Sequence, residues 1–268
     1  MITRREWVKN LMAALLGSGI GATPLSPLFA RNASPSSQFK NNNRYLPHIP
    51  EGLQPNFVNS GPGFARRIAL TFDDGPFPGV TEIILNALQK RNIKATFFMI
   101  GRRVLSAPSL GREVVSAGHE IGNHTQNHVP LSRYNPQRVY YEIAQCQDAI
   151  ENLLSFSPRW FRPPYGAFRR NQGTIPLSRQ LGIALWNVDP QDWRRPGVNK
   201  IVSFVTNHTR PGSIILLHDI HQQTAQAIDQ LLDNLIEREF TFTTLTGFLG
   251  FPYPIIPRAI PVSRPLEA

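Results

Sequence analysis

Cysteine is almost absent from the 268-residue sequence, which contains only Cys146. A single thiol cannot form an internal disulfide, and it excludes a Cys-rich zinc or iron–sulfur site. Cys146 falls on an apolar helical stripe with Val139, Ile143 and Ile150, which predicts a packed thiol rather than a nucleophile. Beyond the N-terminus there is no run of about 18 apolar residues, so the body of the protein is not predicted to be a membrane bundle.

Acidic residues are also scarce, with 18 Asp and Glu against 28 Lys and Arg. The resulting formal charge of +10 favours anionic partners such as nucleic acid, an acidic cell-wall polymer or a lipid surface, and does not choose among them. Hydrophobic residues make up 41% of the chain and charged residues 17%, a composition typical of globular rather than disordered proteins.

Residues 1–30 have the pattern of an export signal. Basic residues at the start, including Arg4 and Arg5, precede an apolar, Gly/Ala-rich stretch from Leu11 to Ala22. The arginine pair resembles a twin-arginine signal; an ordinary secretory signal and an uncleaved anchor are the alternatives. We therefore expect an exported protein that is periplasmic, cell-wall-associated or extracellular, with no stable membrane insertion once the signal is removed.

The rest of the chain divides into three segments. Residues 31–63 are rich in Asn, Pro and Ser and predict a linker, whereas residues 251–268 form a Pro-rich tail. Between them, residues 64–250 alternate strand-like and helix-like segments, which predicts parallel strands with crossover helices. About seven such units suit an α/β fold of the distorted (β/α) barrel type. The expected strands are 67–72, 95–100, 183–186 and 213–217, and the expected helices are 80–91, 136–154 and 224–239.

Two adjacent carboxylates, Asp73 and Asp74, directly follow the first buried strand. Buried neighbouring carboxylates repel one another unless a cation or a proton separates them. A simple Asp-Gly turn that ends the strand is the structural alternative.

His124 and His128 are four residues apart, so one helical turn would aim both imidazoles the same way. Two imidazoles and one carboxylate form a typical zinc-type site with open coordination positions, and a solvated histidine pair is the alternative. Metal affinity should fall below about pH 6, because both rings must be neutral to bind. His119 lies outside the pair, and we expect it to be structural.

Three further polar fragments follow apolar segments. Arg162 stands in a proline-stiffened Arg-Pro-Pro-Tyr loop, Asp192 and Trp193 follow the strand that ends near Trp186, and His218 directly follows an apolar run. In an α/β fold, the carboxyl ends of the strands are where loops converge on an active site. A histidine in this position is typical of an oriented functional group, whereas Trp193 alone would most often be packing.

Taken together, these motifs resemble the NodB-type polysaccharide deacetylases, carbohydrate esterase family four, over about Arg66 to Gly247. The motifs occur in order along the chain: Thr71-Phe72-Asp73-Asp74-Gly75-Pro76, His124-Thr125-x-x-His128, Arg162-Pro163-Pro164-Tyr165, Asp189-x-x-Asp192-Trp193 and Leu216-Leu217-His218. Each motif alone is modest, but five in order are highly specific.

The resemblance implies removal of N-acetyl groups from a polysaccharide or oligosaccharide that contains N-acetylglucosamine, such as peptidoglycan or a chitin-like chain. By this resemblance, one divalent metal, usually zinc, is held by Asp74, His124 and His128. The resemblance implies that Asp73 is the general base and that Arg162 positions it. It implies that His218 is the general acid and that the Asp192 carboxylate raises the pKa of His218. The backbone N–H of Tyr165 is the implied oxyanion donor, and Trp193 and Leu216 are the implied pocket for the acetyl methyl.

The chemistry supports these roles independently. An acetamide is a poor electrophile and water a poor nucleophile, and a divalent cation addresses both problems. The leaving amine needs a proton, which His218 can supply if a carboxylate keeps it cationic. Asp219 is nearer to His218 in sequence than Asp192 is, but adjacent strand residues point to opposite faces, which favours Asp192.

Other functions use the same sequence features. An acetylxylan-type ester deacetylase or a non-sugar amide hydrolase would need the same catalytic residues. A non-catalytic glycan-binding module would not need complete catalytic motifs, and a nucleic-acid binder would need aromatic–basic motifs that the sequence lacks. We expect an N-acetylated glycan as the partner, no nucleic acid, and a monomer.

Overall fold

The computed structural model describes residues 56–63, 65–250 and 252. All of them belong to the second of two units into which the chain divides, Asn43–Ala268. The predicted export signal, most of the predicted linker and all but one residue of the Pro-rich tail lie outside the described residues. Among the helices described, none combines the length and the apolar character that crossing a membrane requires.

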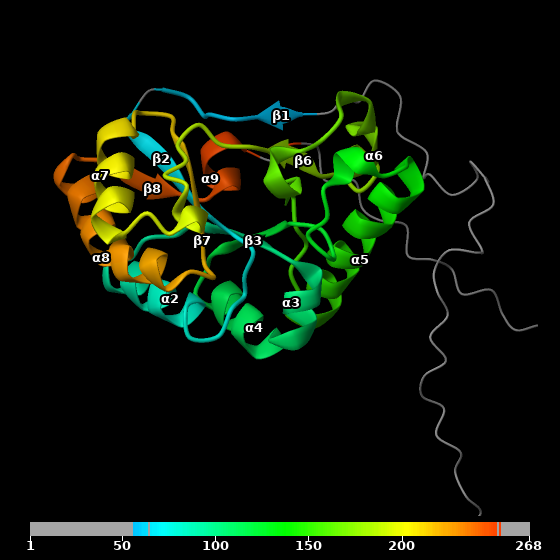
Figure 1. Ribbon diagram of the computed structural model, residues 1–268, viewed down its shortest axis with the longest axis horizontal. Helices are drawn as coiled ribbons and strands as arrows, with labels where there is room; N and C mark the ends of the chain where they lie inside the picture. Colours follow the sequence, from blue (N-terminus) through cyan, green and yellow to red (C-terminus); the bar gives the residue numbers. More distant parts are fainter. Residues whose placement is uncertain (1–55, 64, 251, 253–268) are drawn as a thin grey trace, which may run out of the picture. The chain divides into compact units, whose positions relative to one another are not determined.

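The strands form one parallel sheet, as the alternating sequence pattern predicts (Figure 1). The order is β1-β6-β5-β4-β3-β2-β7, and β8 pairs with β2. The strands are β1 (Phe57–Val58), β2 (Arg67–Asp73), β3 (Thr96–Met99), β4 (Glu120–Asn123), β5 (Trp160–Phe161), β6 (Gly182–Ala184), β7 (Ile214–His218) and β8 (Thr241–Thr243).

The sheet curls without closing into a continuous ladder of strands. Two isolated bridges link the two ends of this strand order. Ser60, after β1, pairs with Ser213, just before β7, and Val188, after β6, pairs with Ile215 of β7. This is the distorted barrel expected from the sequence. Strand β1 lies within residues 31–63, which the sequence predicts to be a linker. Phe57 and Val58 pair with Ile183 and Ala184 of β6, so this part of the segment belongs to the sheet.

Helices alternate with the strands along the chain (Figure 1). The α-helices are α2 (Thr81–Lys90), α3 (Gly101–Ser106), α4 (Pro108–Ser116), α5 (Pro136–Leu154), α6 (Thr174–Leu177), α7 (Val198–His208), α8 (Gln222–Glu237) and α9 (Leu245–Leu249). Four 3-10 turns are η2 (Leu131–Arg133), η3 (Pro164–Gly166), η4 (Arg170–Gln172) and η5 (Asp192–Arg194).

Helix α5 has the bounds that its sequence predicts, because both ends carry local signals. The Asn135 side chain accepts a hydrogen bond from the Arg138 N–H, Pro136 occupies the first turn, and Ser155 ends the helix in a left-handed conformation. Its apolar stripe, Cys146 included, is buried.

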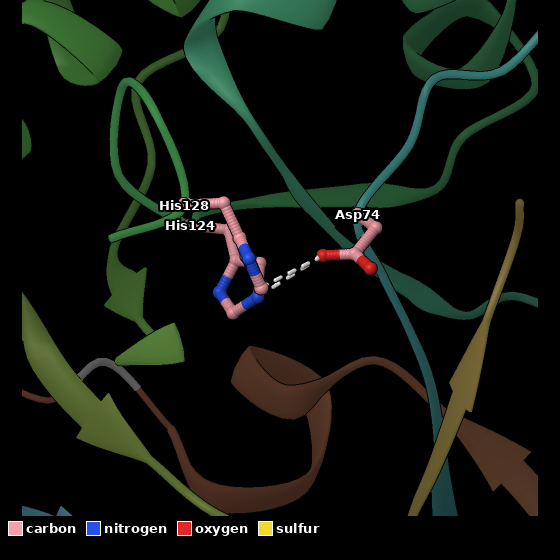
Figure 2. A group of neighbouring side chains, drawn as sticks. All are labelled: Asp74, His124 and His128. Carbon is pink, nitrogen blue, oxygen red and sulfur yellow. Dashed lines mark ion pairs between the residues drawn. The ribbon is translucent and has the colours of Figure 1, made fainter. Parts of the chain in front are cut away.

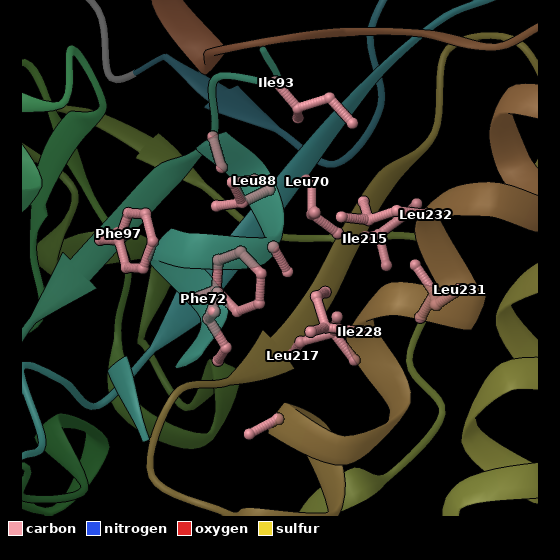
Figure 3. Packing of buried hydrophobic residues seen from close by; sticks show 14 of the residues in the cluster. Leu70, Phe72, Leu88, Ile93, Phe97, Ile215, Leu217, Ile228, Leu231 and Leu232 are labelled. Carbon is pink, nitrogen blue, oxygen red and sulfur yellow. The ribbon is translucent and has the colours of Figure 1, made fainter. Parts of the chain in front are cut away.

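The main core fills the space between β2, β3, β7 and the helices α2 and α8. Alternation along the central strands and helical periodicity in α8 bring their apolar side chains together. Figure 3 shows this packing, in which the labelled residues are Leu70, Phe72, Leu88, Ile93, Phe97, Ile215, Leu217, Ile228, Leu231 and Leu232. Burial on this scale makes the strands a rigid base for the polar loops at their ends.

The carboxyl ends of the strands meet at one edge of the sheet, since all the pairings between the described strands β1 to β8 are parallel. Asp73 ends β2 and is in register with His218, which ends β7. His124 directly follows β4, and Arg162 directly follows β5. The residues singled out in the sequence are therefore gathered at this edge.

Candidate active site

The first element of the site is the turn after β2. Asp73 is the last residue of the strand and Asp74 adopts a left-handed conformation, with φ of 81°. Asp74 donates its N–H to the Phe98 carbonyl, 3.1 Å away, and Gly75 accepts from Ile100 at the same distance. The turn is thereby tied to β3, and both carboxylates are buried.

The second element is the loop of residues 124–128 after β4. The expectation of a helical turn is wrong, because Thr125 and His128 have φ angles of 67° and 56°. The loop is held by hydrogen bonds: Thr125 N–H donates to Asn123 Oδ1, and His128 N–H donates to Thr125 Oγ1, both at 3.0 Å. The imidazoles of His124 and His128 are nevertheless brought together, with ring centres 5.0 Å apart.

These two elements form a cluster of three possible metal ligands. Asp74 Oδ1 lies 3.5 Å from His124 Nε2 and 3.1 Å from His128 Nε2. Figure 2 shows both rings directed toward this carboxylate. One ligand atom from each residue lies within 4.8 Å of the other two.

The donor set fits a divalent cation. Asp74 Oδ1 is buried and has no hydrogen-bond partner in the part of the chain that the structure describes. A buried carboxylate oxygen without a partner is costly, and a cation between it and the imidazoles would satisfy it. This cluster is a possible metal site.

The protonation state of His124 suits a ligand. Its Nδ1 is 2.7 Å from the Arg162 carbonyl, which can only accept, so Nδ1 carries the hydrogen and the Nε2 lone pair faces Asp74. Burial lowers the pKa of His124 to about 3, and burial also lowers the pKa of His128. The fall in metal affinity, expected above near pH 6, should therefore occur at lower pH.

Asp73 lies beside this cluster but has a different partner. Its Oδ1 accepts from Arg162 Nη1 at 2.7 Å, and its Oδ2 is 3.6 Å from His124 Nε2. Burial raises the pKa of Asp73, and the charge and hydrogen bond of Arg162 oppose that rise. The carboxylate is thus oriented and available as a proton acceptor.

Arg162 is itself fully enclosed, with an exposed fraction of 0%. Its guanidinium donates to the backbone carbonyls of Ala184 and Leu185, each at 3.0 Å, and to Thr71 Oγ1 at 2.8 Å. The plane packs against the Phe98 ring, 4.1 Å from its centre. These contacts fix the guanidinium and leave it one charged partner, Asp73.

On the other side of Asp73, His218 pairs with Asp192. Asp192 Oδ1 is 2.7 Å from His218 Nδ1, while Oδ2 accepts from the His218 backbone N–H at 2.8 Å and from Thr224 Oγ1 at 2.6 Å. Burial acts to lower the pKa of His218, but the hydrogen bond and charge of Asp192 outweigh it and raise this pKa to about 9. His218 is therefore cationic at neutral pH.

The remaining predicted residues differ in exposure. Tyr165 is 68% exposed and its ring packs edge-on against His128, with centres 4.7 Å apart. Trp193 is 47% exposed beside the buried Asp192, and Leu216 is buried on β7. His119 accepts from the Ala95 N–H and packs against Phe97, a structural environment.

Sequence reasoning missed a buried carboxylate that supports the histidine loop. Glu142, on α5, accepts from the Asn127 backbone N–H at 2.9 Å and from its side-chain amide at 3.1 Å. Glu142 also pairs with Arg138. The available signal was an acidic residue beside the apolar stripe of a helix, where burial requires partners.

A parallel α/β fold that gathers ionisable side chains at the carboxyl edge of its strands is typical of enzymes. Residues 61–186 match the family model described as polysaccharide deacetylase. A chitooligosaccharide deacetylase from Bradyrhizobium sp. (strain ANU 289) is 40% identical over 192 residues, covering 65% of this chain and 87% of its own length. The chain therefore belongs to the polysaccharide deacetylase family.

Two further relatives extend this comparison. The peptidoglycan-N-acetylglucosamine deacetylase PgdA of Listeria monocytogenes is 35% identical over 187 residues, which is 69% of this chain. The match spans only 39% of that relative. The solved structure of the Bc1960 peptidoglycan N-acetylglucosamine deacetylase superposes with a TM-score of 0.70 at 32% identity, covering 72% of this chain and 92% of that one.

Proposed function

We propose that this protein is a metal-dependent hydrolase that removes N-acetyl groups from a glycan containing N-acetylglucosamine. The observation that carries the proposal is the unpartnered Asp74 Oδ1, which faces two neutral imidazoles within 3.5 Å. An oriented carboxylate and a cationic histidine lie beside it, on Asp73 and His218. Amide hydrolysis needs a proton acceptor and a proton donor of this kind on one substrate.

The proposed metal ligands are Asp74, His124 and His128, and the proposed metal is zinc. Two imidazoles and one carboxylate are a ligand set that zinc favours, and they leave coordination positions free. When bound, the cation polarises the acetyl carbonyl and lowers the pKa of the attacking water. The hydrogen bond from His124 Nδ1 to the Arg162 carbonyl fixes that ligand's orientation.

Asp73 acts as the general base in this proposal. Arg162 holds one oxygen of its carboxylate, so the other oxygen is free to take a proton from the attacking water. Burial raises the pKa of Asp73, and the charge and hydrogen bond of Arg162 favour its ionised form and limit that rise.

His218 acts as the general acid. Asp192 orients the ring through Nδ1, which leaves Nε2 as the group that donates a proton to the departing amine. A pKa near 9 keeps that proton in place at neutral pH until the amine needs it. The Tyr165 N–H, in a left-handed turn with φ of 60°, is the proposed oxyanion donor.

Trp193 and Leu216 form the proposed apolar pocket for the acetyl methyl, and peptidoglycan or a chitin-like chain is the proposed substrate. We propose export, with action in the periplasm, in the cell wall or outside the cell, and a monomeric state. An ester deacetylase with the same catalytic residues is the second candidate. The proposed residues act on an acetyl carbonyl, whether a nitrogen atom or an oxygen atom of the sugar carries the acetyl group.

Acetate release from metal-quantified protein tests the proposal. N-acetylglucosamine oligomers, peptidoglycan and acetylxylan are offered in parallel at equal acetyl concentration. We expect acetate from the first two at rates well above that from acetylxylan, and none after chelation. Acetate from acetylxylan alone would establish the ester function, and full activity of metal-free protein would refute the metal site.

A further inference from the structure

An exposed arginine stands beside the metal-ligand loop. The first turn of α3 is tied to that loop, because the N–H groups of Gly101 and Arg102 donate to Thr125 and Gln126 at 3.0 and 3.1 Å. The Arg102 side chain is exposed. Burial is the largest cause that lowers the pKa of His128, and the Arg102 charge is one of the smaller causes in the same direction. Arg102 thus presents a positive charge at the proposed site.

Two more exposed arginines stand beside the proposed acid. Arg194 and Arg195 follow Asp192 and Trp193 in the chain, and the Arg195 N–H donates to the Asp192 carbonyl at 2.8 Å. The Arg194 guanidinium lies 4.7 Å from the centre of the exposed Trp193 ring. Both arginines are solvent-exposed.

These charges are not neutralised by neighbouring acids. Within residues 56–63 and 65–250, no ion pair involves Arg102, Arg194 or Arg195. Asp189 lies in the same loop as the last two, but it is half-buried and its Oδ1 accepts from the Gln191 N–H at 2.7 Å. Unpaired guanidinium groups favour carboxylate partners, which they can bind in a bidentate manner.

We propose that the site prefers an N-acetylated glycan that carries carboxylate groups on the sugars next to the acetyl group removed, and that Arg102, Arg194 and Arg195 recognise them. This inference rests on the proposed deacetylase function and narrows its substrate class. A glycan that alternates N-acetylglucosamine with N-acetylmuramic acid has such carboxylates, on its lactyl ethers. A chitin chain has none.

The test compares one glycan in two charge states. Short N-acetylglucosamine–N-acetylmuramic acid oligosaccharides are used with free lactyl carboxylates or with the same groups converted to methylamides. Acetate release gives kcat/KM for each. We expect the carboxylate form to be preferred by about tenfold at low salt, mainly through KM, and less at 0.5 M NaCl because salt screens exposed charges.

Variants assign the preference to the arginines. Arg102→Gln, Arg194→Gln and Arg195→Gln should each reduce the preference by about two- to fivefold, because kcat/KM for the carboxylate form falls by more than kcat/KM for the methylamide form. Arg210→Gln is the matched control, since Arg210 is exposed just before the opposite end of β7. Equal turnover of both charge states, or a preference that survives all three substitutions, would overturn the inference while leaving the proposed function intact. Acetate from no substrate would overturn both.

A second inference rests on a different observation, the buried carboxylate of Asp219. Its Oδ1 accepts from the Gly75 N–H at 2.9 Å, its Oδ2 accepts from Thr81 Oγ1 at 2.7 Å, and its own N–H donates to the Asp73 carbonyl at 3.2 Å. A Cβ on Gly75 would lie 2.0 Å from the carboxylate, so this contact requires glycine. Asp219 directly follows the strand that ends at His218, and its hydrogen bonds hold the turn that contains Asp74.

We infer that Asp219 is a positioning residue that holds Asp74 in its metal-binding conformation. Asp74 has a left-handed backbone, which an aspartate adopts at some cost, and the hydrogen bonds of Asp219 to the residues on either side of it offset that cost. Without them, the turn would relax and the Asp74 carboxylate would move away from the two imidazoles.

Metal affinity separates positioning from general stability. Asp219→Ala should weaken zinc binding, measured by chelator competition, by about ten- to a hundredfold, and Asp219→Asn should rescue part of that loss. Glu120→Gln is the control, because Glu120 is likewise buried and hydrogen-bonded to two threonine hydroxyls at the opposite end of β4. It should lower Tm without changing zinc affinity. Unchanged zinc affinity in folded Asp219→Ala, with or without a lower Tm, would overturn the inference.

Discussion

Two histidines at this edge of the sheet, the buried His124 and the partly buried His218, have opposite proton affinities. The pKa of His124 is lowered to about 3, and that of His218 is raised to about 9. Burial is the largest influence on both and acts downward on both. The difference comes from the partner of Nδ1, which is the Arg162 carbonyl for His124 and the Asp192 carboxylate for His218.

A carbonyl fixes the tautomer and favours the charged ring only through its hydrogen bond, whereas a carboxylate adds a full negative charge that stabilises the cation. His124 is thereby suited to bind a cation through Nε2, and His218 to donate a proton. One residue type thus has two chemical uses at one site, and the partner decides which. Substitutions of the partners and of the histidines test this conclusion.

The largest effect is expected at the metal-binding histidine and its carboxylate neighbour. His124→Ala and Asp74→Ala each remove one of three proposed ligands, so both should abolish stoichiometric zinc binding and acetate release. Metal content by mass spectrometry and turnover by acetate assay measure the two outcomes. Stoichiometric zinc in His124→Ala would show that this neutral ring is not a ligand.

Asp73→Asn should have the next largest effect. An amide cannot accept the proton from water, so turnover should fall by about a hundredfold or more, while the metal ligands remain intact. Zinc content should stay at the level of the unmodified protein. Near-normal turnover would assign Asp73 a structural role beside Arg162, and loss of zinc would add it to the ligand set.

Asp192→Asn should reduce the difference between the two histidines. Without the Asp192 charge, burial acts to lower the pKa of His218 while the charges of Asp73 and Asp74 still act to raise it, so this pKa should fall from about 9 toward its ordinary value of 6.5. The alkaline limb of the pH–rate profile should therefore move toward acid. His218→Ala should lack that limb altogether. A limb that remains near pH 9 in both variants would belong to another group.

The same change should alter stability with a defined sign. Because the folded-state pKa of His218 is above the ordinary value, its pairing with Asp192 stabilises the fold fully below pH 6.5, and this contribution is lost as pH rises through 9. Asp192→Asn should therefore flatten the fall in unfolding free energy between these pH values. Urea titrations at pH 6 and pH 9.5 measure it, and an unchanged slope would contradict the assignment.

Sequence reasoning predicted the parts of the site that follow from strand periodicity. The sequence favours Asp192 over Asp219 as the neighbour of His218 because adjacent strand residues point to opposite faces, and the hydrogen bonds of both carboxylates agree with that argument. The 124–128 loop was expected to be helical, since a spacing of four suits a helix. The loop is held by hydrogen bonds that its backbone N–H groups donate to the side chains of Asn123, Thr125 and Glu142, and spacing alone does not reveal these contacts.

The short elements could not be predicted from sequence patterns either. Strand β8 has three residues and helix α9 has five, too few for a clear period of either kind. Their positions depend on a long-range contact: Glu120, at the start of β4, accepts from the Thr246 N–H at 3.1 Å. Such contacts join residues that are distant in the chain, so only the folded arrangement identifies them.

Cys146 provides the smallest expected effect and shows what burial does without an ionic partner. Burial raises the pKa of this thiol to about 12, and its nearest polar contact is the Met99 carbonyl, 3.3 Å from Sγ. That carbonyl accepts the thiol hydrogen and so stabilises the neutral form of Cys146. Cys146→Ala should leave turnover and its pH profile unchanged and lower the unfolding free energy by about 1 kcal/mol, the cost of a small cavity.

In the folded protein, the Cys146 thiol should react with iodoacetamide only through unfolding, so the labelling rate should rise with urea concentration. Rapid labelling under native conditions would show that burial alone does not keep a buried group in its neutral form, and the contrast between His124 and His218 would then need another cause.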